Sequence, residues 1–168
     1  MLVSETINKA VLDCGASRTV CGSEWFSIYL DSLPEKDREK IKEKPSNTMF
    51  KFGAGMLRAS KRVTIPMSVC DKKIDLEVDV VDTDIPLLLS LPTMKELGMS
   101  IDFKADKVLI GDNEFLLETT STGHYTLSLS APKDTDYINH IMHEILAAEI
   151  ETGTAGASKK ALKLHKRF

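Results

Sequence analysis

A regular alternation of apolar and polar residues in the middle of the chain constrains its fold more than any other feature. Between Lys73 and Val81 apolar side chains occupy every second position. A β-strand points successive side chains to opposite faces, so this spacing predicts a strand with one buried face. A similar alternation runs from Val63 to Val69, just before it. The two runs together predict a β-sheet at the centre of the fold.

Further strand-like segments surround this pair, so we predict a mostly β domain. They cover residues 10–12, 19–21, 48–52, 85–89, 101–103, 107–110, 114–117 and 125–129. The segment Ile85–Leu89 is wholly apolar, which predicts a strand buried on both faces. Ser90 as N-cap, Pro92 in the first turn and Gly98 after the last turn predict a short helix next to it.

Three segments have helical rather than strand-like features. Apolar residues recur at helical spacing between Trp25 and Leu33, and the charged run Glu35–Lys44 follows a capping-box pattern that begins at Ser32. Helical spacing returns between Tyr137 and Leu146, ahead of a Gly- and Ser-rich linker and a basic tail. We therefore predict a domain over 1–130 and a C-terminal helix, flexible linker and tail over 131–168.

Composition and charge argue against several classes of protein. The 168 residues carry a net charge of −3, which disfavours a dedicated nucleic-acid-binding domain. Three cysteines cannot all pair within one chain. A small, odd number of cysteines favours a reducing compartment. No apolar signal segment follows Met1, and no run approaches the ~18 apolar residues of a membrane span. We expect a soluble cytoplasmic protein with no membrane partner and no nucleic acid bound directly.

One short segment carries a candidate catalytic group. In Val11–Ser17 a carboxylate, Asp13, follows two apolar residues and precedes Gly15 and two small residues. Glycine permits a sharp turn, and small side chains let another backbone approach closely. A purely structural turn at the end of a strand explains this segment about equally well, so the segment alone does not assign a function.

The segment resembles the active-site loop of the retropepsins, the aspartic proteases of retroviruses and retrotransposons. Their pattern is apolar-apolar-Asp-Thr/Ser-Gly-Ala/Ser. Ile85–Leu89 with Ser90 and the short helix is similar to the second signature of this family. Gly53-Ala54-Gly55 lies where the family has the tip of the flap that closes over substrate. The resemblance covers roughly residues 2–103 and implies a retropepsin-like β-barrel with one lobe per chain.

Residues 50–53, 63–66 and 84–90 are also similar to the protease region of long-terminal-repeat retrotransposon polyproteins. This narrower resemblance implies that the protein processes such a polyprotein, in the cytoplasm or inside virus-like particles.

The resemblance implies catalysis by a homodimer without a metal or organic cofactor. Each chain has one such loop, so Asp13 would meet its symmetry mate on a two-fold axis. Two adjacent carboxylates share one proton, which lets one activate water while the other stabilises the oxyanion of an extended polypeptide substrate. The other site residues that the resemblance implies are Cys14, Gly15, Ala16 and Ser17 in the loop, Gly53, Ala54 and Gly55 in the flap, and Ile85, Leu87 and Ser90 against substrate.

Two residues depart from the family pattern and leave two functions open. Cys14 replaces a threonine or serine that braces the paired loops, and we interpret it as a small buried residue, with a redox-sensitive pair as the alternative. Ser90 replaces a glycine. An active aspartic endopeptidase is the first hypothesis, and a weak or inactive, domesticated retropepsin fold that dimerises or binds peptides is the second. Dimer contacts are expected from residues 99–129 or 137–146.

A metal site is not predicted from the two neighbouring histidines. His140 and His143 are one helical turn apart, but no Cys or His nearby in the sequence completes a set of four ligands.

Overall fold

The two alternating runs form the longest strands of the protein and pair with each other in a hairpin. The computed structural model describes residues 3–53 and 55–130. In it β6 (Lys61–Val69) and β7 (Lys72–Val81) pair from Lys61 and Val80 to Val69 and Lys72. The apolar residues of both runs are buried, which confirms the predicted strands. Cys70 and Asp71 have positive φ angles, as the tight turn of a two-residue hairpin requires.

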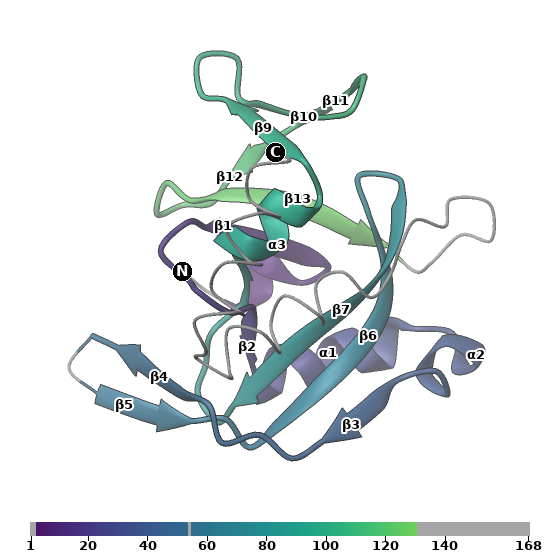
Figure 1. The fold of residues 1–168 in the computed structure, drawn as a ribbon, viewed down its shortest axis with the longest axis vertical. Coiled ribbons are helices and arrows are strands. Elements are labelled where there is room, and N and C mark those ends of the chain that lie inside the picture. Colours follow the sequence, from purple (N-terminus) through teal and green to yellow (C-terminus); the bar gives the residue numbers. More distant parts are fainter. Residues whose placement is uncertain (1–2, 54, 131–168) are drawn as a thin grey trace, which may run out of the picture.

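Four other strands join this hairpin to make a closed barrel (Figure 1). They are β1 (Lys9–Asp13), β2 (Val20–Gly22), β8 (Leu87–Ser90) and β13 (Tyr125–Ser130). The order is β13-β1-β8-β2-β7-β6, and β13 pairs with β6 to close the ring. Two short strands, β3 (Lys42–Lys44) and β12 (Glu118–Thr119), extend the sheet beyond the barrel. The barrel confirms the mostly β fold class predicted from the sequence.

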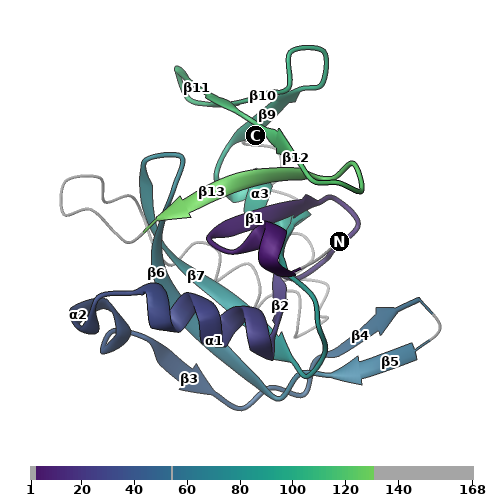
Figure 2. The same ribbon diagram turned by 180° about the vertical axis from the view of Figure 1, so that it is seen from behind.

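One helix covers one side of the barrel, and another follows strand β8. Figure 2 shows α1 (Ser23–Ser32) lying across β6 and β7. Trp25 and Tyr29 of α1 are buried and stack with their ring centroids 5.0 Å apart. The Trp25 indole also donates a hydrogen bond of 2.9 Å to the carbonyl of Thr6, in the short 3-10 helix Val3–Thr6. The short helix predicted after Ser90 is α3 (Leu91–Glu96), and the Ser90 hydroxyl caps it.

The predicted helix over residues 35–44 is wrong. The chain forms only a four-residue helix, α2 (Glu35–Arg38), before β3 pairs with residues 62–64 of β6. The expected cap is missing because the Ser32 hydroxyl donates to the carbonyl of Tyr29, 2.6 Å away, inside the preceding helix. A short, uncapped and exposed helix is marginal in water, so pairing with the edge of the barrel prevails over the local helical pattern.

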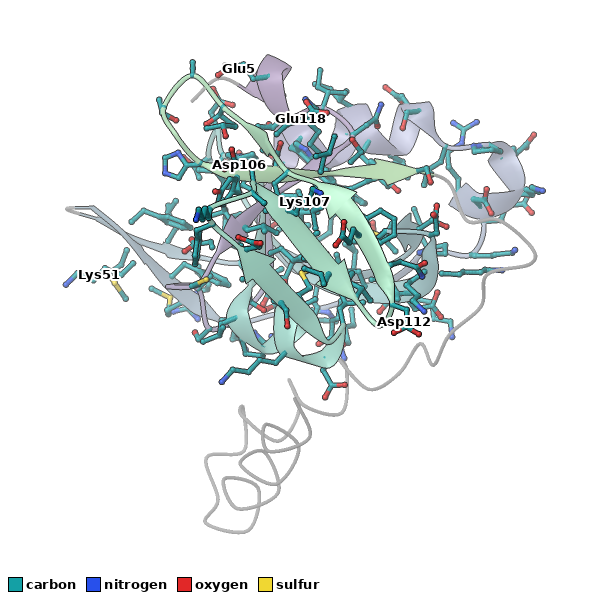
Figure 3. All side chains as sticks on the ribbon, turned by 90° about the horizontal axis from the view of Figure 1, so that it is seen from above. Glu5, Lys51, Asp106, Lys107, Asp112 and Glu118 are labelled. Atoms are coloured by element: carbon teal, nitrogen blue, oxygen red, sulfur yellow. The ribbon has the colours of Figure 1, made fainter. Side chains whose placement is uncertain are left out.

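Two smaller sheets extend from opposite ends of the barrel (Figures 1 and 3). One is the hairpin of β4 (Met49–Phe52) and β5 (Gly55–Arg58), which we call the β4–β5 hairpin. The other is a three-stranded sheet of β9 (Met99–Asp102), β10 (Lys107–Ile110) and β11 (Asn113–Leu116). Figure 3 shows Lys51 of the β4–β5 hairpin and Asp112 of the small sheet on opposite sides of the molecule.

Some predictions fall on residues that the structure does not describe. The C-terminal helix over 137–146, its histidines, the linker and the tail all lie outside the described residues, as does Ala54. In the part of the chain that is described, no helix is long and apolar enough to span a membrane.

Candidate active site

Parallel pairing of two barrel strands places Asp13 beside the start of a helix. Strands β1 and β8 run in the same direction, with Asp13 directly opposite Ser90. Both strands therefore end at one edge of the sheet, where the loop after β1 meets α3. The amide of Leu91 donates a hydrogen bond of 3.1 Å to the carbonyl of Ala16, which ties the loop to the helix.

The loop of residues 13–17, called here the Asp13 loop, folds back on its own carboxylate. The Gly15 amide donates to Asp13 Oδ1 at 2.9 Å, and the Ala16 amide donates to the Asp13 carbonyl at 3.1 Å. Asp13 itself is half-buried, so its carboxylate is fixed by a backbone amide yet remains accessible to solvent. Cys14 is exposed, which contradicts our interpretation of it as a small buried residue.

Three buried hydroxyl groups support the Asp13 loop from below. Thr19 Oγ1 lies 3.2 Å from Ser90 Oγ and 3.0 Å from Thr93 Oγ1, and it accepts a hydrogen bond of 3.1 Å from the Ser90 amide. Ser90 Oγ and Thr93 Oγ1 are also 3.0 Å apart. Sequence reasoning identified Ser90 as a cap but missed Thr19 and Thr93. Only the capping spacing of Ser90 and Thr93 could have suggested part of this cluster.

A pocket of about 330 Å³ opens next to the catalytic candidate. Its lining residues are Val11, Leu12, Asp13, Asp84, Ile85, Pro86, Leu88 and His124. Ile85 was expected to contact substrate and does line this pocket. Leu87 and Ser90 were expected there too, but both are 0% exposed and do not line the pocket. Side chains alternate along a strand, so Leu88 faces the pocket in place of Leu87.

The β4–β5 hairpin is connected to this pocket through apolar side chains. Phe50 and Phe52 point to one face of the hairpin, with their ring centroids 6.0 Å apart. They pack in a small cluster with Ile85 and Leu88 of the pocket. The other members of the cluster are Val20, Ala59 and Val81. At the far end of the hairpin Gly53 has a φ of +53°, and Gly55 follows after the undescribed Ala54.

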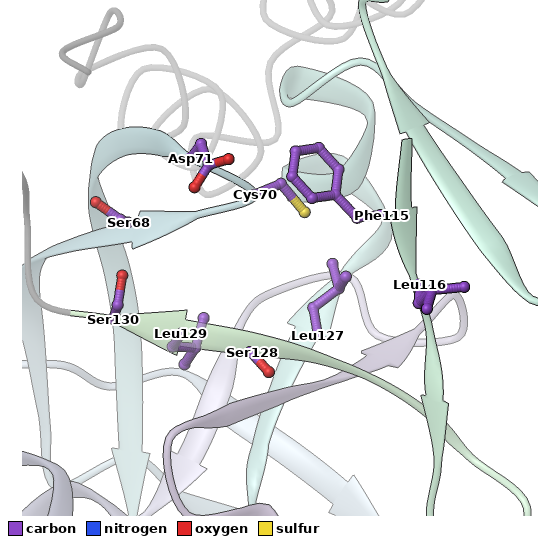
Figure 4. Close-up of a pocket in the computed structure, with 9 residues that line it drawn as sticks. All are labelled: Ser68, Cys70, Asp71, Phe115, Leu116, Leu127, Ser128, Leu129 and Ser130. Atoms are coloured by element: carbon purple, nitrogen blue, oxygen red, sulfur yellow. The ribbon is translucent and has the colours of Figure 1, made fainter. Parts of the chain in front are cut away.

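Two other pockets differ in their distance from the Asp13 loop. An apolar groove of about 330 Å³ begins at the loop itself, and its lining residues are Cys14, Leu91, Met94, Lys95, Met99, Ile101 and Phe103. A third pocket lies at the turn of the β6–β7 hairpin, where Figure 4 shows Cys70 and Phe115 beside Leu127. None of its lining residues belongs to the Asp13 loop.

The two other cysteines, Cys21 and Cys70, are buried. Burial, with a smaller contribution from Asp79, raises the pKa of the Cys21 thiol, and burial raises the pKa of Cys70 to about 12. Among residues 3–53 and 55–130, no group of three or more His, Cys, Asp or Glu side chains could hold a metal ion.

Comparison with known proteins finds likeness only among solved structures. No protein-family model and no curated protein matches the sequence. Among solved structures, the chain is similar to the retroviral protease-like domain of Ddi1 from Leishmania major, with 19% sequence identity and a TM-score of 0.45. The match covers 66% of this chain and 87% of that one. The closed, mostly β barrel described above agrees with the mostly β fold class that the sequence predicted.

Proposed function

We propose that the protein is an aspartic endopeptidase in which two copies each contribute Asp13. The observation that carries this proposal is the placement of Asp13 at the end of β1. Its carboxylate is held by the Gly15 amide, half-exposed, and borders a pocket that Ile85 and Leu88 make partly apolar. A fixed carboxylate beside a substrate-sized cleft is what water activation needs.

Catalysis in this proposal depends on a second carboxylate from the partner copy. Two Asp13 side chains across a two-fold axis would hold one proton between them, because two adjacent charges repel strongly. The ionised member accepts a proton from water, whose oxygen attacks the carbonyl carbon of the peptide. The protonated member donates a hydrogen bond to the carbonyl oxygen, and the member that accepted the water proton then passes it to the leaving amine as the C–N bond breaks.

The apolar groove beside the Asp13 loop is our candidate for the surface that the second copy covers. It begins at Cys14, one residue from Asp13, and Phe103 at its other end is 70% exposed. Strand β9, which supplies Met99 and Ile101, forms an edge of its three-stranded sheet. A copy seated here would bury an exposed apolar surface next to the group that must pair, which supports this choice of interface.

The substrate in this proposal is an extended polypeptide with apolar side chains next to the cleaved bond. It would lie between the Asp13 loop and the β4–β5 hairpin, held by backbone hydrogen bonds. Ala16, Ile85 and Leu88 offer apolar walls for its side chains. Cleavage of a random peptide library should therefore select apolar residues on both sides of the cut. Selection of charged residues on both sides would contradict this part of the proposal.

We further propose that the natural substrate is the polyprotein of a retrotransposon, with the enzyme active in the cytoplasm or in virus-like particles. Support for this narrower role comes only from the short sequence segments described above. A second candidate function is a non-catalytic module that dimerises or binds peptides. The replacement of the usual hydroxyl by Cys14 favours that candidate, because a thiol braces the paired loops less well.

The deciding experiment compares the wild-type protein with Asp13→Asn on a denatured protein substrate at mildly acidic pH. We expect cleavage by the wild type, inhibition by pepstatin and loss of cleavage in Asp13→Asn. Asp112→Asn is the matched control, since Asp112 is an exposed aspartate in the β10–β11 turn. Cleavage that survives in Asp13→Asn would overturn the assignment, and a wild type that binds but never cuts peptides would favour the second candidate.

A further inference from the structure

A buried network of charged side chains lies between the Asp13 loop and the β4–β5 hairpin. Its centre is Asp79 of β7, which is 1% exposed, with Glu77 two residues earlier and 3% exposed. Two buried arginines, Arg18 and Arg62, face these carboxylates. Isolated charges are very costly to bury, so the members of such a network must keep their mutual geometry.

One side of the network holds the Asp13 loop. Arg18 directly follows this loop, and its Nε donates to Asp79 Oδ2 at 2.9 Å. Arg18 Nη2 is also 3.6 Å from Glu77 Oε1. The Asp79 amide donates to the carbonyl of Thr19 at 3.0 Å, so both the side chain and the backbone of Asp79 secure the chain that leaves the loop.

The other side of the network holds the base of the β4–β5 hairpin. Arg62 Nε donates to Asp79 Oδ1 at 2.9 Å, and Arg62 Nη2 donates to Thr48 Oγ1 at 2.6 Å. Ser46 Oγ adds a hydrogen bond of 2.7 Å to Asp79 Oδ1. Thr48 directly precedes β4, and its carbonyl accepts a hydrogen bond of 2.8 Å from Ala59, just past β5. These contacts anchor both ends of the hairpin.

The two sides meet at the same carboxylate, which couples them. Arg18 Nε donates to Asp79 Oδ2, while Arg62 donates to Oδ1 through Nε and to Oδ2, at 3.4 Å, through Nη2. Glu77 Oε1 is likewise near both guanidinium groups, 3.6 Å from Arg18 Nη2 and 3.8 Å from Arg62 Nε, so a shift of one arginine disturbs the buried carboxylates that the other contacts. Arg62 transmits this constraint to the hairpin mainly through a short charge-assisted hydrogen bond to the Thr48 hydroxyl, with a longer one of 3.5 Å to Ser46 Oγ.

We propose that Asp79 and Arg62 are positioning residues, which set the place of the β4–β5 hairpin relative to Asp13 through the hydroxyl of Thr48. This inference rests on the proposed function, in which the β4–β5 hairpin contacts the peptide substrate. Loss of the hydrogen bond between Arg62 and Thr48 would leave the Asp13 loop intact but loosen the β4–β5 hairpin. Substrate and transition state would then be held less well to a similar degree, so KM rises while kcat stays nearly constant.

The test uses Thr48 because substitution of the buried charges could prevent folding. Thr48→Val keeps the shape of the side chain and removes its hydroxyl, whereas Thr48→Ser keeps the hydroxyl. We expect Thr48→Val to raise KM for a peptide substrate about tenfold, with kcat within about twofold of the wild type. Thr48→Ser should restore the wild-type KM. Equal KM values in all three proteins would overturn the proposal.

A second measurement tests the coupling without reference to catalysis. Hydrogen–deuterium exchange of the whole chain should quicken over residues 49–58 in Thr48→Val and remain at the wild-type rate in Thr48→Ser. Thr119→Val, at an exposed strand position, is the control and should leave these residues unchanged. Unchanged exchange in Thr48→Val overturns the coupling. If the wild type cuts no peptide yet exchange quickens as expected, the endopeptidase proposal fails while the coupling stands.

Discussion

At the scale of single residues, Gly22 shows how closely the barrel is packed near the site. Its amide donates to the carbonyl of Ile85 at 3.1 Å. A Cβ at this position would lie 2.2 Å from the Thr83 carbonyl oxygen and 2.8 Å from that of Ile85. Both neighbours are backbone atoms, so relief requires β2 to separate from the segment that precedes β8.

We therefore expect Gly22→Ala to destabilise the protein by about 3 kcal/mol or more, or to prevent folding. Urea denaturation followed by circular dichroism measures the loss. Gly55→Ala is the matched control, because a Cβ there would meet nothing closer than 3.9 Å. Similar stabilities for the two variants would contradict this account of Gly22.

The hydroxyl cluster beneath the Asp13 loop predicts a second effect at this scale. Thr19→Val removes a group that lies within hydrogen-bonding distance of both Ser90 and Thr93, and it leaves the Ser90 amide without its acceptor. We expect a loss of about 1–3 kcal/mol in the free energy of unfolding. The exposed Thr119→Val should change it by less than about 0.5 kcal/mol. A loss no larger in Thr19→Val than in Thr119→Val would show that the cluster contributes little.

The three cysteines should differ in reactivity, because only the thiolate reacts. Cys14 is exposed, whereas Cys21 and Cys70 are buried and burial raises the pKa of both thiols. Brief treatment of the folded protein with iodoacetamide, at a dilution where it is monomeric, should label Cys14 and spare the other two, as peptide mass spectrometry would show. Labelling of Cys21 before Cys14 would contradict the placement of these residues.

At the scale of secondary structure, the sequence predicted the elements whose pattern matches their burial. Alternation along 63–69 and 73–81 predicted the two longest strands, and the spacing from Trp25 to Tyr29 predicted α1. The charged run after Pro34 predicted a helix that is too long, because the end of this run pairs as β3 with β6, which is distant in the sequence. Local pattern cannot reveal such a partner.

The same limit explains what sequence reasoning missed at the site. Asp13 and its loop could be recognised because the motif is contiguous. Leu88 could not be distinguished from Leu87, since a run of three leucines has no alternation to show which face each occupies. The contacts of Thr19 with Ser90 and of Arg62 with Thr48 join separate segments and depend on the folded barrel.

At the scale of the whole molecule, buried thiol and phenol groups should make the free energy of unfolding depend on pH in the alkaline range. Burial raises the pKa of Cys21 above its ordinary value of 9.0 and that of Cys70 to about 12. Burial, with a smaller contribution from Asp37, likewise raises the pKa of Tyr29. Above pH 9 the unfolded chain loses protons that the folded chain retains, so unfolding becomes more favourable as the pH rises.

We therefore expect the free energy of unfolding to fall from about pH 9 upward, by at most about 1.4 kcal/mol per pH unit for each such group. Urea denaturation at several pH values measures the slope. Cys70→Ala should show a shallower slope, because it has one titrating group fewer. A free energy of unfolding that stays constant between about pH 8 and pH 11 would contradict this view of the buried thiols.

The central claim also belongs to the whole molecule: two chains must supply one Asp13 each. The measurement that tests it most directly mixes wild-type chains with Asp13→Asn chains and follows peptidase activity per wild-type chain. With random exchange in equal amounts, about half of the wild-type chains have a wild-type partner, so this activity should fall to about half. A ninefold excess of Asp13→Asn should lower it to about one tenth. Activity per wild-type chain that is unchanged by the added variant would show that one chain suffices, and would contradict the account.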